Sequence, residues 1–285
     1  MGIISHGNQQ PESLSEASAD ANVQMLRDQL EQFELGRFLK ANLGLNGFWT
    51  SYVLLHPQNG QRSRLSSDGT PLCPLESWLL EKCPILLATQ ERFEIFRRIT
   101  QSHIKAGMQL ASIPSGLMDD LLSLDYSQTE NVHLTAVDLD QESLDHARVR
   151  YERFAPPVAA AFEQRDAWNL ESPMRWDLIT SNGLNIYVDD NQHCIELYRS
   201  IARSLRPNGL FVCSFITPVQ QWQPFDPADL ERQRHMFTEV LPVKWQCTRD
   251  EAQTRAQLNA AGMNVLSVHY DKQRMFPAVV ATPKP

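Results

Sequence analysis

The sequence predicts an α/β fold with a mostly parallel sheet, preceded by a helical segment. Two observations lead to this prediction. Beyond residue 105, short apolar runs alternate with stretches of helical spacing, which is the order that builds a parallel sheet with crossover helices. Between Met108 and Asp138, the chain reads as a strand, a turn, a helix and a second strand that ends in an acid. This layout is typical of a Rossmann-like, doubly wound nucleotide-binding unit.

The expected elements follow from the period of the apolar residues. We expect strands at residues 108–113, 132–137, 160–164, 177–181, 210–215, 265–269 and 278–282. Helices separate most of these strands and include residues 141–154 and 192–205. The α/β domain therefore spans residues 106–285.

The first 105 residues divide into two parts. Residues 1–18 are polar, Ser-rich and without periodicity, and we expect them to form a disordered tail. Residues 19–105 form a helical cap segment in front of the α/β domain. Within this segment we expect helices at 19–41, from 74 onward and at 89–105, with irregular chain at 42–75.

Composition and charge limit the classes of function. The net charge of −8 and the lack of a basic stripe argue against a nucleic-acid partner, whose phosphates are held by clustered Lys and Arg. No apolar run approaches the roughly 20 residues that span a bilayer, so no membrane partner is expected. The five cysteines are scattered and form no Cys-x-x-Cys pair, which predicts neither a zinc site nor a disulfide framework. A reducing, cytoplasmic location fits best.

The turn and the acid of the first unit are spaced for a nucleotide-like ligand. Asp138 lies 22 residues after Gly116, close to the spacing of about 20 at which such an acid binds a ribose diol. Gly116 belongs to a tight turn that lets the backbone approach a ligand. A carboxylate at the end of the second strand and a turn glycine therefore predict one binding site.

Further stretches extend this pattern: Ala136–Asp140, Phe162–Trp168, and the pair Trp176–Asn182 and Leu205–Leu210. Together with the first strand and turn, and in this order over about 175 residues, they resemble the class I S-adenosylmethionine-dependent methyltransferases. The chain around 112–120 and 181–187 also resembles a group of uncharacterised bacterial methyltransferase-like proteins. The family resemblance implies a seven-stranded sheet whose last strand is antiparallel, and S-adenosylmethionine as the cofactor.

The first loop departs from the family pattern, which places an acid at the strand end and then three glycines. Here Ser112 stands where the acid is expected, Pro114 and Met118 occupy two glycine positions, and only Gly116 remains. A proline turn can still expose backbone N–H groups at the start of the next helix. The cofactor contacts that the resemblance implies are Ser112, Pro114, Gly116, Asp119, Asp138, Leu139, Asp166, Ala167 and Ser181.

The resemblance also implies a role for several of these residues. Asp138 would accept hydrogen bonds from the ribose hydroxyls, Leu139 would pack on the adenine, and Asp166 would accept from the adenine amino group. Asp119 would face the amino group of the methionine moiety. Asp166 also fits an ordinary turn, and Asp119 also fits simple matching of the helix dipole.

The acceptor end of the site is less defined by the sequence. Residues 181–187 are polar at the end of a strand, where open α/β sheets bind ligands. No residue is assigned as a catalytic base, because His193 is a lone histidine and such residues are more often structural. The predicted acceptor-lining residues are Asn182, Asn185, Tyr187, His193 and Phe215, and further candidates are Trp222, Phe225, Tyr52 and His56.

The expected function is transfer of a methyl group from S-adenosylmethionine to a small-molecule acceptor. Two other interpretations remain. A nicotinamide-dependent oxidoreductase shares the first unit, although the chain lacks G-x-G-x-x-G. A non-catalytic, methyltransferase-like ligand-binding protein would explain the lost glycines. The sequence predicts neither the methyl acceptor nor the oligomeric state.

Overall fold

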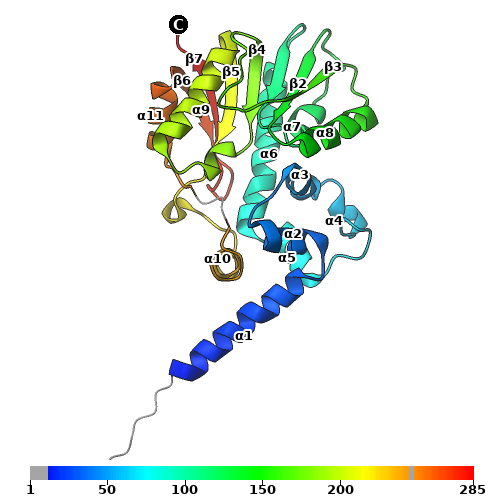
Figure 1. Cartoon of the computed structure of the whole chain (residues 1–285), viewed down its shortest axis with the longest axis vertical. Helices are drawn as coiled ribbons and strands as arrows, with labels where there is room; N and C mark the ends of the chain where they lie inside the picture. Colours follow the sequence, from blue (N-terminus) through cyan, green and yellow to red (C-terminus); the bar gives the residue numbers. More distant parts are fainter. Residues whose placement is uncertain (1–11, 244–246) are drawn as a thin grey trace, which may run out of the picture.

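The α/β domain contains one twisted sheet, as predicted. The computed structural model describes residues 12–243 and 247–285, and Figure 1 shows the sheet above a helical N-terminal region. The strand order is β3-β2-β1-β4-β5-β7-β6, and β7 runs antiparallel to β5 and β6. This confirms the Rossmann-like, doubly wound fold class. The strands are β1 (Gln109–Ser112), β2 (His133–Asp138), β3 (Ala159–Gln164), β4 (Trp176–Ser181), β5 (Leu205–Ser214), β6 (Met263–His269) and β7 (Ala278–Pro283).

Helices cover both faces of the sheet. One face packs against α6 (Pro84–His103), α7 (Asp119–Leu122) and α8 (Gln141–Phe154). The other face packs against α9 (Asn191–Ser204) and α11 (Glu251–Ala260). Neighbouring strand residues alternate between the two cores: Leu110 packs on the first face and Ala111 on the second. Burial on both faces explains the continuous apolar runs of the central strands.

Local signals set the ends of several elements. Asp140 caps α8, since its carboxylate accepts the backbone N–H groups of Glu142 and Ser143, both at 3.2 Å. Asn208 takes the left-handed conformation, with φ +64°, which asparagine tolerates better than most residues. It lies in the irregular part of β5, between Leu205, which pairs with Trp176 of β4, and Leu210, which pairs with Leu178.

The N-terminal region is more helical than the sequence suggests. It contains α1 (Glu12–Leu30), α2 (Glu34–Asn42), α3 (Gly47–Leu55), α4 (Gly60–Ser63) and α5 (Pro74–Glu81). The expected tail at 1–18 needs correction, because residues 12–18 belong to α1, while residues 1–11 lie outside the described residues. The expected helix at 19–41 is broken at Phe33, whose extended backbone lets its side chain enter the core.

The stretch predicted as irregular, residues 42–75, contains two of these helices. The longer one, α3, begins where the Asn46 side chain accepts the Trp49 backbone N–H at 3.0 Å. Its apolar residues then pack into the core on more than one side, so the helical period is hidden in the sequence. The Gly, Ser and Pro residues on either side of α3 are typical of loops, and the sequence therefore predicts irregular chain there.

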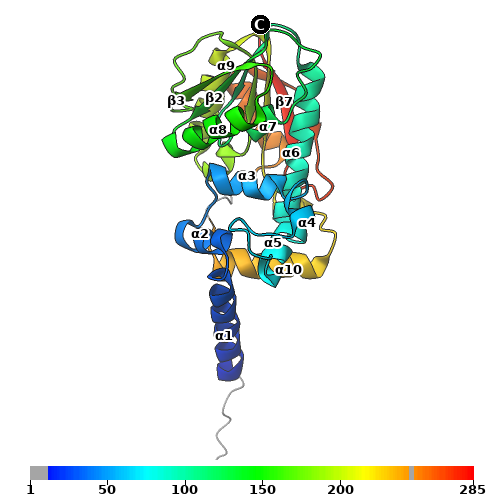
Figure 2. The same cartoon turned by 90° about the vertical axis from the view of Figure 1, so that its right-hand side faces the viewer.

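The N-terminal region and the α/β domain share a hydrophobic core. Leu30, Leu79 and Val53 pack in one cluster with Met236 and Phe276, which come from the C-terminal half. Figures 1 and 2 both show α6 running from the helical region up beside the sheet, while α1 extends away from the body. Within the described residues, we find no helix that is long and apolar enough to cross a membrane.

Candidate functional site

A cavity of about 370 Å³ lies at the carboxyl ends of β1, β2 and β4. This is the edge of the sheet at which α/β folds bind their ligands. One wall is the loop between β1 and α7, and another is the segment 182–187 that follows β4. Residues of α3 and α6, two helices that come before β1 in the chain, line another side of the cavity. The predicted residues that line this cavity are Ser112, Pro114, Gly116, Asp119, Asp138, Asn182 and Tyr187.

A carboxylate does stand at the end of β1, but it comes from α7. The buried Ser112 places its Oγ 3.1 Å from both carboxylate oxygens of Asp120. Thr180, near the end of β4, donates its hydroxyl to Asp120 Oδ2 at 2.5 Å. Asp120 is 4% exposed and lines the cavity between the two central strands. Burial raises the pKa of Asp120, and the hydrogen bonds from Thr180 and Ser112 partly oppose this.

The turn that lost its glycines is held to β2 by backbone hydrogen bonds. Ser115 N–H donates to the carbonyl of Val137 at 2.8 Å. Gly116 N–H donates to Asp138 Oδ2 at 2.8 Å, and Gly116 has φ +47°, where a side chain is strained. The bond between Ile113 and Pro114 is cis.

Asp138 is positioned as the sequence spacing predicts. Its Oδ1 accepts the Asp140 N–H at 3.0 Å, in addition to the Gly116 N–H on Oδ2. Each carboxylate oxygen can accept more than one hydrogen bond, so both can still receive a ligand hydroxyl. Burial raises the pKa of Asp138, and the two backbone N–H groups partly oppose this.

Asp119 is another buried acidic residue in the wall of the cavity. Its Oδ1 forms an ion pair with Arg150 Nε of α8 at 2.5 Å. Burial is the main cause that raises the pKa of Asp119 to about 6, while Arg150 and the Ser51 hydroxyl lower it. A carboxyl group with this pKa is mostly ionised at neutral pH, and its charge is then paired with the Arg150 guanidinium.

Helix α3 contacts the loop between β1 and α7 directly, and the sequence did not predict this contact. A Cβ atom on Gly47 would lie 2.7 Å from Ser143 Oγ and 3.0 Å from Gly116 Cα. Glycine at position 47 therefore allows α3 to approach both the turn and α8. Asn46 and Thr50 follow the same wall of the cavity.

The opposite end of the cavity is basic. Arg92 of α6 lines it and is 4% exposed. Its Nη1 donates to Ser214 Oγ at 3.4 Å, and its guanidinium carbon lies 4.6 Å from the centroid of the Phe276 ring. The sequence analysis did not predict a role for Arg92, although its helical spacing from Ala88, Ile95 and Phe96 places it on the apolar face of α6.

Four of the predicted cofactor contacts lie outside this cavity. Leu139 is 68% exposed just beyond β2, and Asp166 is exposed after β3. Asp166 Oδ1 accepts the Trp168 N–H at 2.9 Å, which is an ordinary turn contact. The Arg165 N–H donates to the Asp138 carbonyl at 2.9 Å, so the loop after β3 lies beside the end of β2 at the open side of the site. The other two, Ala167 and Ser181, are buried.

Several predicted acceptor-lining residues do not reach the cavity. Asn185 is buried, and its carbonyl accepts from Arg249 Nη1 at 2.9 Å. His193 stacks on Trp168 with ring centroids 4.5 Å apart, outside the cavity. Phe215 is fully buried in the sheet core, so its position at the end of a strand reflects packing.

The remaining acceptor candidates also lie elsewhere. Trp222 lines a separate, apolar groove. Phe225 is exposed on the surface.

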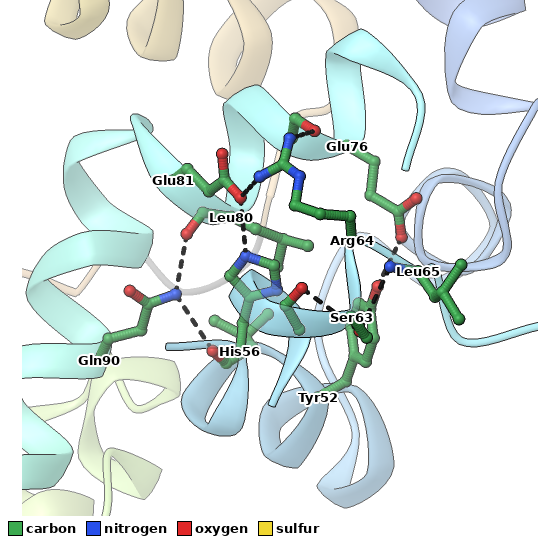
Figure 3. A network of polar contacts seen from close by, with 12 residues as sticks. Tyr52, His56, Ser63, Arg64, Leu65, Glu76, Leu80, Glu81 and Gln90 are labelled. Atoms are coloured by element: carbon green, nitrogen blue, oxygen red, sulfur yellow. Dashed lines mark hydrogen bonds and ion pairs between the residues drawn. The ribbon is translucent and has the colours of Figure 1, made fainter. Parts of the chain in front are cut away.

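Tyr52 and His56 belong to a polar network between α3, α4 and α5, drawn in Figure 3. Tyr52 donates its hydroxyl to Glu76 Oε1 at 2.8 Å. His56 Nε2 lies 3.2 Å from Glu81 Oε1, and Arg64 also forms an ion pair with Glu81. The two residues line a neighbouring cavity, so they stabilise the cap segment and do not cover the site.

Comparisons with known proteins agree with this geometry. A family model described as a methyltransferase domain matches residues 120–209. A Bordetella parapertussis structure described as a possible exported protein is 36% identical, covers 98% of this chain and 100% of its own, and has a TM-score of 0.82. A Methanosarcina mazei S-adenosylmethionine-dependent methyltransferase is 13% identical over 65% of this chain and 97% of its own, with a TM-score of 0.50. The search of curated proteins finds no match.

Proposed function

The chain matches a methyltransferase domain over residues 120–209, and on that premise we propose that it is a class I S-adenosylmethionine-dependent methyltransferase and methylates a small-molecule acceptor. The observation that carries the proposal is the pairing of Gly116 with Asp138. It joins the turn after β1 to the carboxylate after β2, and leaves lone pairs of the carboxylate for a ribose diol. The neighbouring cavity is large enough for a small ligand and is closed by the cap segment.

The residues present suit the chemical groups of S-adenosylmethionine. Asp138 would accept from the ribose hydroxyls, and the carboxyl oxygens of Asp119 and Asp120 would accept from the methionine amino group. Asn182 Oδ1 is a buried oxygen without a hydrogen-bond partner among the described residues, and Asn182 lines the cavity. Leu139 and Asp166, at the open side, would meet the adenine.

The protein's part in the reaction is mainly alignment. When bound, S-adenosylmethionine supplies a methyl group that its positive sulfur already activates. The cap segment would exclude water, and the walls would hold acceptor and methyl donor in line. Tyr187, at the acceptor side, has a pKa that burial raises, so its hydroxyl keeps its proton at neutral pH and serves as a donor rather than a base.

We propose a small acceptor, and no nucleic-acid or membrane partner, from three supporting observations. Residues of α3 and α6 line one side of the cavity, whose volume of about 370 Å³ suits a small ligand. The net charge of −8 disfavours a phosphate backbone. The place after β4, where nucleic-acid amino-methyltransferases often carry two prolines, holds Ser181, Asn182 and Gly183.

We propose the cytoplasm as the location. All five cysteines are free in the structure, and three of them are buried, which suits a reducing compartment. The Bordetella parapertussis relative is described as a possible exported protein. Fractionation of the source cells, followed by immunodetection, tests the location.

The proposed function is tested by calorimetric binding of S-adenosylmethionine, S-adenosylhomocysteine and NAD. We expect both adenosyl compounds to bind and NAD not to bind. Asp138→Ala should weaken binding at least about tenfold, because charge-assisted bonds to the ribose are lost. Asp145→Ala, an exposed acid on α8, is the control and should bind normally. Failure of both adenosyl compounds to bind would favour the non-catalytic interpretation, and binding of NAD alone would favour the oxidoreductase.

A further inference from the structure

Arg92 is a buried cation in the wall of the cavity. It is 4% exposed, and it reaches from α6 to the ends of β4 and β5. Nη1 donates to Ser214 Oγ at 3.4 Å, and a Cβ on Gly183 would lie 3.1 Å from the same nitrogen. Its Nε is buried and has no hydrogen-bond partner among the described residues. No hydrogen bond from Nη2 is found among the described residues, and Nη2 is not among the fully buried atoms, so the guanidinium keeps a donor that no protein group uses.

No carboxylate forms an ion pair with Arg92 in the described part of the chain. None of the ion pairs found within 4.0 Å includes Arg92. Asp271, the acid that acts on it from a distance, uses its oxygens to accept the N–H groups of Gln273, Met275 and Phe276. Burial lowers the pKa of Arg92 to about 10, and Tyr187 and Asp271 oppose this. The side chain is still charged at neutral pH, and a buried unpaired charge is costly.

The cavity is thus divided by charge. Asp119, Asp120 and Asp138 stand at the end formed by the loops after β1 and β2. Arg92 stands at the other end. The cavity lining includes the apolar residues Ile85, Leu86, Phe93, Ile186 and Phe276, together with the polar Thr89 and Tyr187.

The acidic end suits the cationic methyl donor of the proposed function, on which this inference rests. The basic end would repel that same cation. An anionic group pairs most strongly with a buried guanidinium, and a planar carboxylate matches its fork of donors. The apolar surroundings favour an uncharged, hydrophobic body attached to it.

From this division we propose that the methyl acceptor is a small carboxylic acid with an apolar body, and that Arg92 binds its carboxylate. The Ser214 hydroxyl holds one guanidinium nitrogen, and the Phe276 ring supports the guanidinium face. Arg92 is then a specificity-determining residue. It selects an acid over its neutral analogue and holds the acceptor at the end of the cavity away from Asp119.

The test compares acids with their neutral, nearly isosteric amides. The probes are benzoate with benzamide, and 3-phenylpropanoate with 3-phenylpropanamide. Each is titrated calorimetrically into the full chain, with and without saturating S-adenosylhomocysteine. The wild-type protein should bind at least one acid about tenfold more tightly than its amide, as expected for a charge-assisted pair.

Two variants separate a binding role from a structural one. Arg92→Met should remove the preference for the acid and leave affinity for the amide and for S-adenosylhomocysteine within about twofold of wild type. Arg92→Gln is a second neutral variant, in case the methionine does not fold. Arg98→Met changes an exposed arginine on the same helix and should keep the preference.

Three results would overturn the proposal. The first is equal or no binding of acid and amide by the wild-type protein in both pairs. The second is an acid preference that persists in both Arg92 variants. The third is a tenfold loss of S-adenosylhomocysteine affinity in these variants, which would assign Arg92 to the carboxylate of the cofactor. If S-adenosylhomocysteine fails to bind the wild-type protein, the proposed function fails, while the titrations without it still test Arg92.

Discussion

At the scale of single residues, the site depends on buried carboxylates. Asp119 and Asp120 are adjacent in the chain but face different partners. Asp119 pairs with Arg150, whereas Asp120 accepts from Ser112 and Thr180. Burial raises the pKa of both. A buried carboxyl group with a raised pKa destabilises the folded protein when it ionises. This loss of stability is common where a carboxylate is placed to bind a cationic ligand.

This cost predicts how stability depends on pH at Asp119. Its pKa is about 6 in the folded protein and lower when unfolded, so the folded state holds the proton more tightly. The stability that Asp119 contributes is greatest below about pH 4 and is lost as the pH rises through about 6. The groups that face it are Arg150, Ser51 and Asp120.

Asp119→Asn removes this titration. The melting temperature of the variant minus that of the wild-type protein should therefore rise between about pH 4 and pH 7. Scanning fluorimetry across this range measures the difference, and the ion pair with Arg150, which forms only as Asp119 ionises, is already included in the pKa of about 6. A difference that stays flat or falls with pH would contradict the assignment.

At the scale of elements, the position of α3 determines how closely the cap segment covers the site. Gly47 lets it approach the turn at Gly116 and the first turn of α8. The contact joins an N-terminal helix to the loop that we assign to the cofactor.

Gly47→Ala should force α3 away from this loop. The added Cβ would lie 2.7 Å from Ser143 Oγ and 3.0 Å from the Gly116 backbone, and such overpacking costs about 1–3 kcal/mol. Urea unfolding should show this loss, and calorimetry should show weaker S-adenosylhomocysteine binding. Gly44→Ala, where the nearest atom is 3.9 Å away, is the matched control. Equal effects of the two substitutions would show that the close contact has no special role.

The strands of the α/β domain and its helices at 141–154 and 192–205 were predictable from apolar runs, helical periods and caps, whereas the helix at Pro227–His235 was not predicted. The helix at 141–154 has the same bounds in the structure, and Asp140 caps it. The helix α3 was missed because apolar residues surround it, which removes the period. Asp138 and Gly116 were predictable from their spacing. Arg92 and Gly47 were not, because only tertiary packing brings α6 and α3 to the loops of the sheet.

At the scale of the whole molecule, the cap segment and the α/β domain share one core. Leu79 of α5 is fully buried in the cluster that also contains Met236 and Phe276. Neither part can bury its apolar surface without the other. The boundary at residue 105 therefore separates sequence patterns, and the packing is continuous across it.

The shared core predicts a single cooperative unfolding transition. Calorimetry should give one heat-absorption peak, with calorimetric and van't Hoff enthalpies in agreement. Leu79→Ala should lower the free energy of unfolding by about 2–5 kcal/mol and shift the whole peak. Two peaks, of which only one responds to this substitution, would show that the cap segment folds independently.

The central claim is that the divided cavity holds the cofactor at its acidic end and leaves Arg92 for the acceptor. The most direct test is a crystal structure of the chain with S-adenosylhomocysteine. We predict that the ribose hydroxyls contact Asp138, that the amino group faces the wall containing Asp119, and that no atom of the ligand contacts Arg92. A homocysteine carboxylate bound to Arg92, or a ligand bound outside this cavity, would contradict the account.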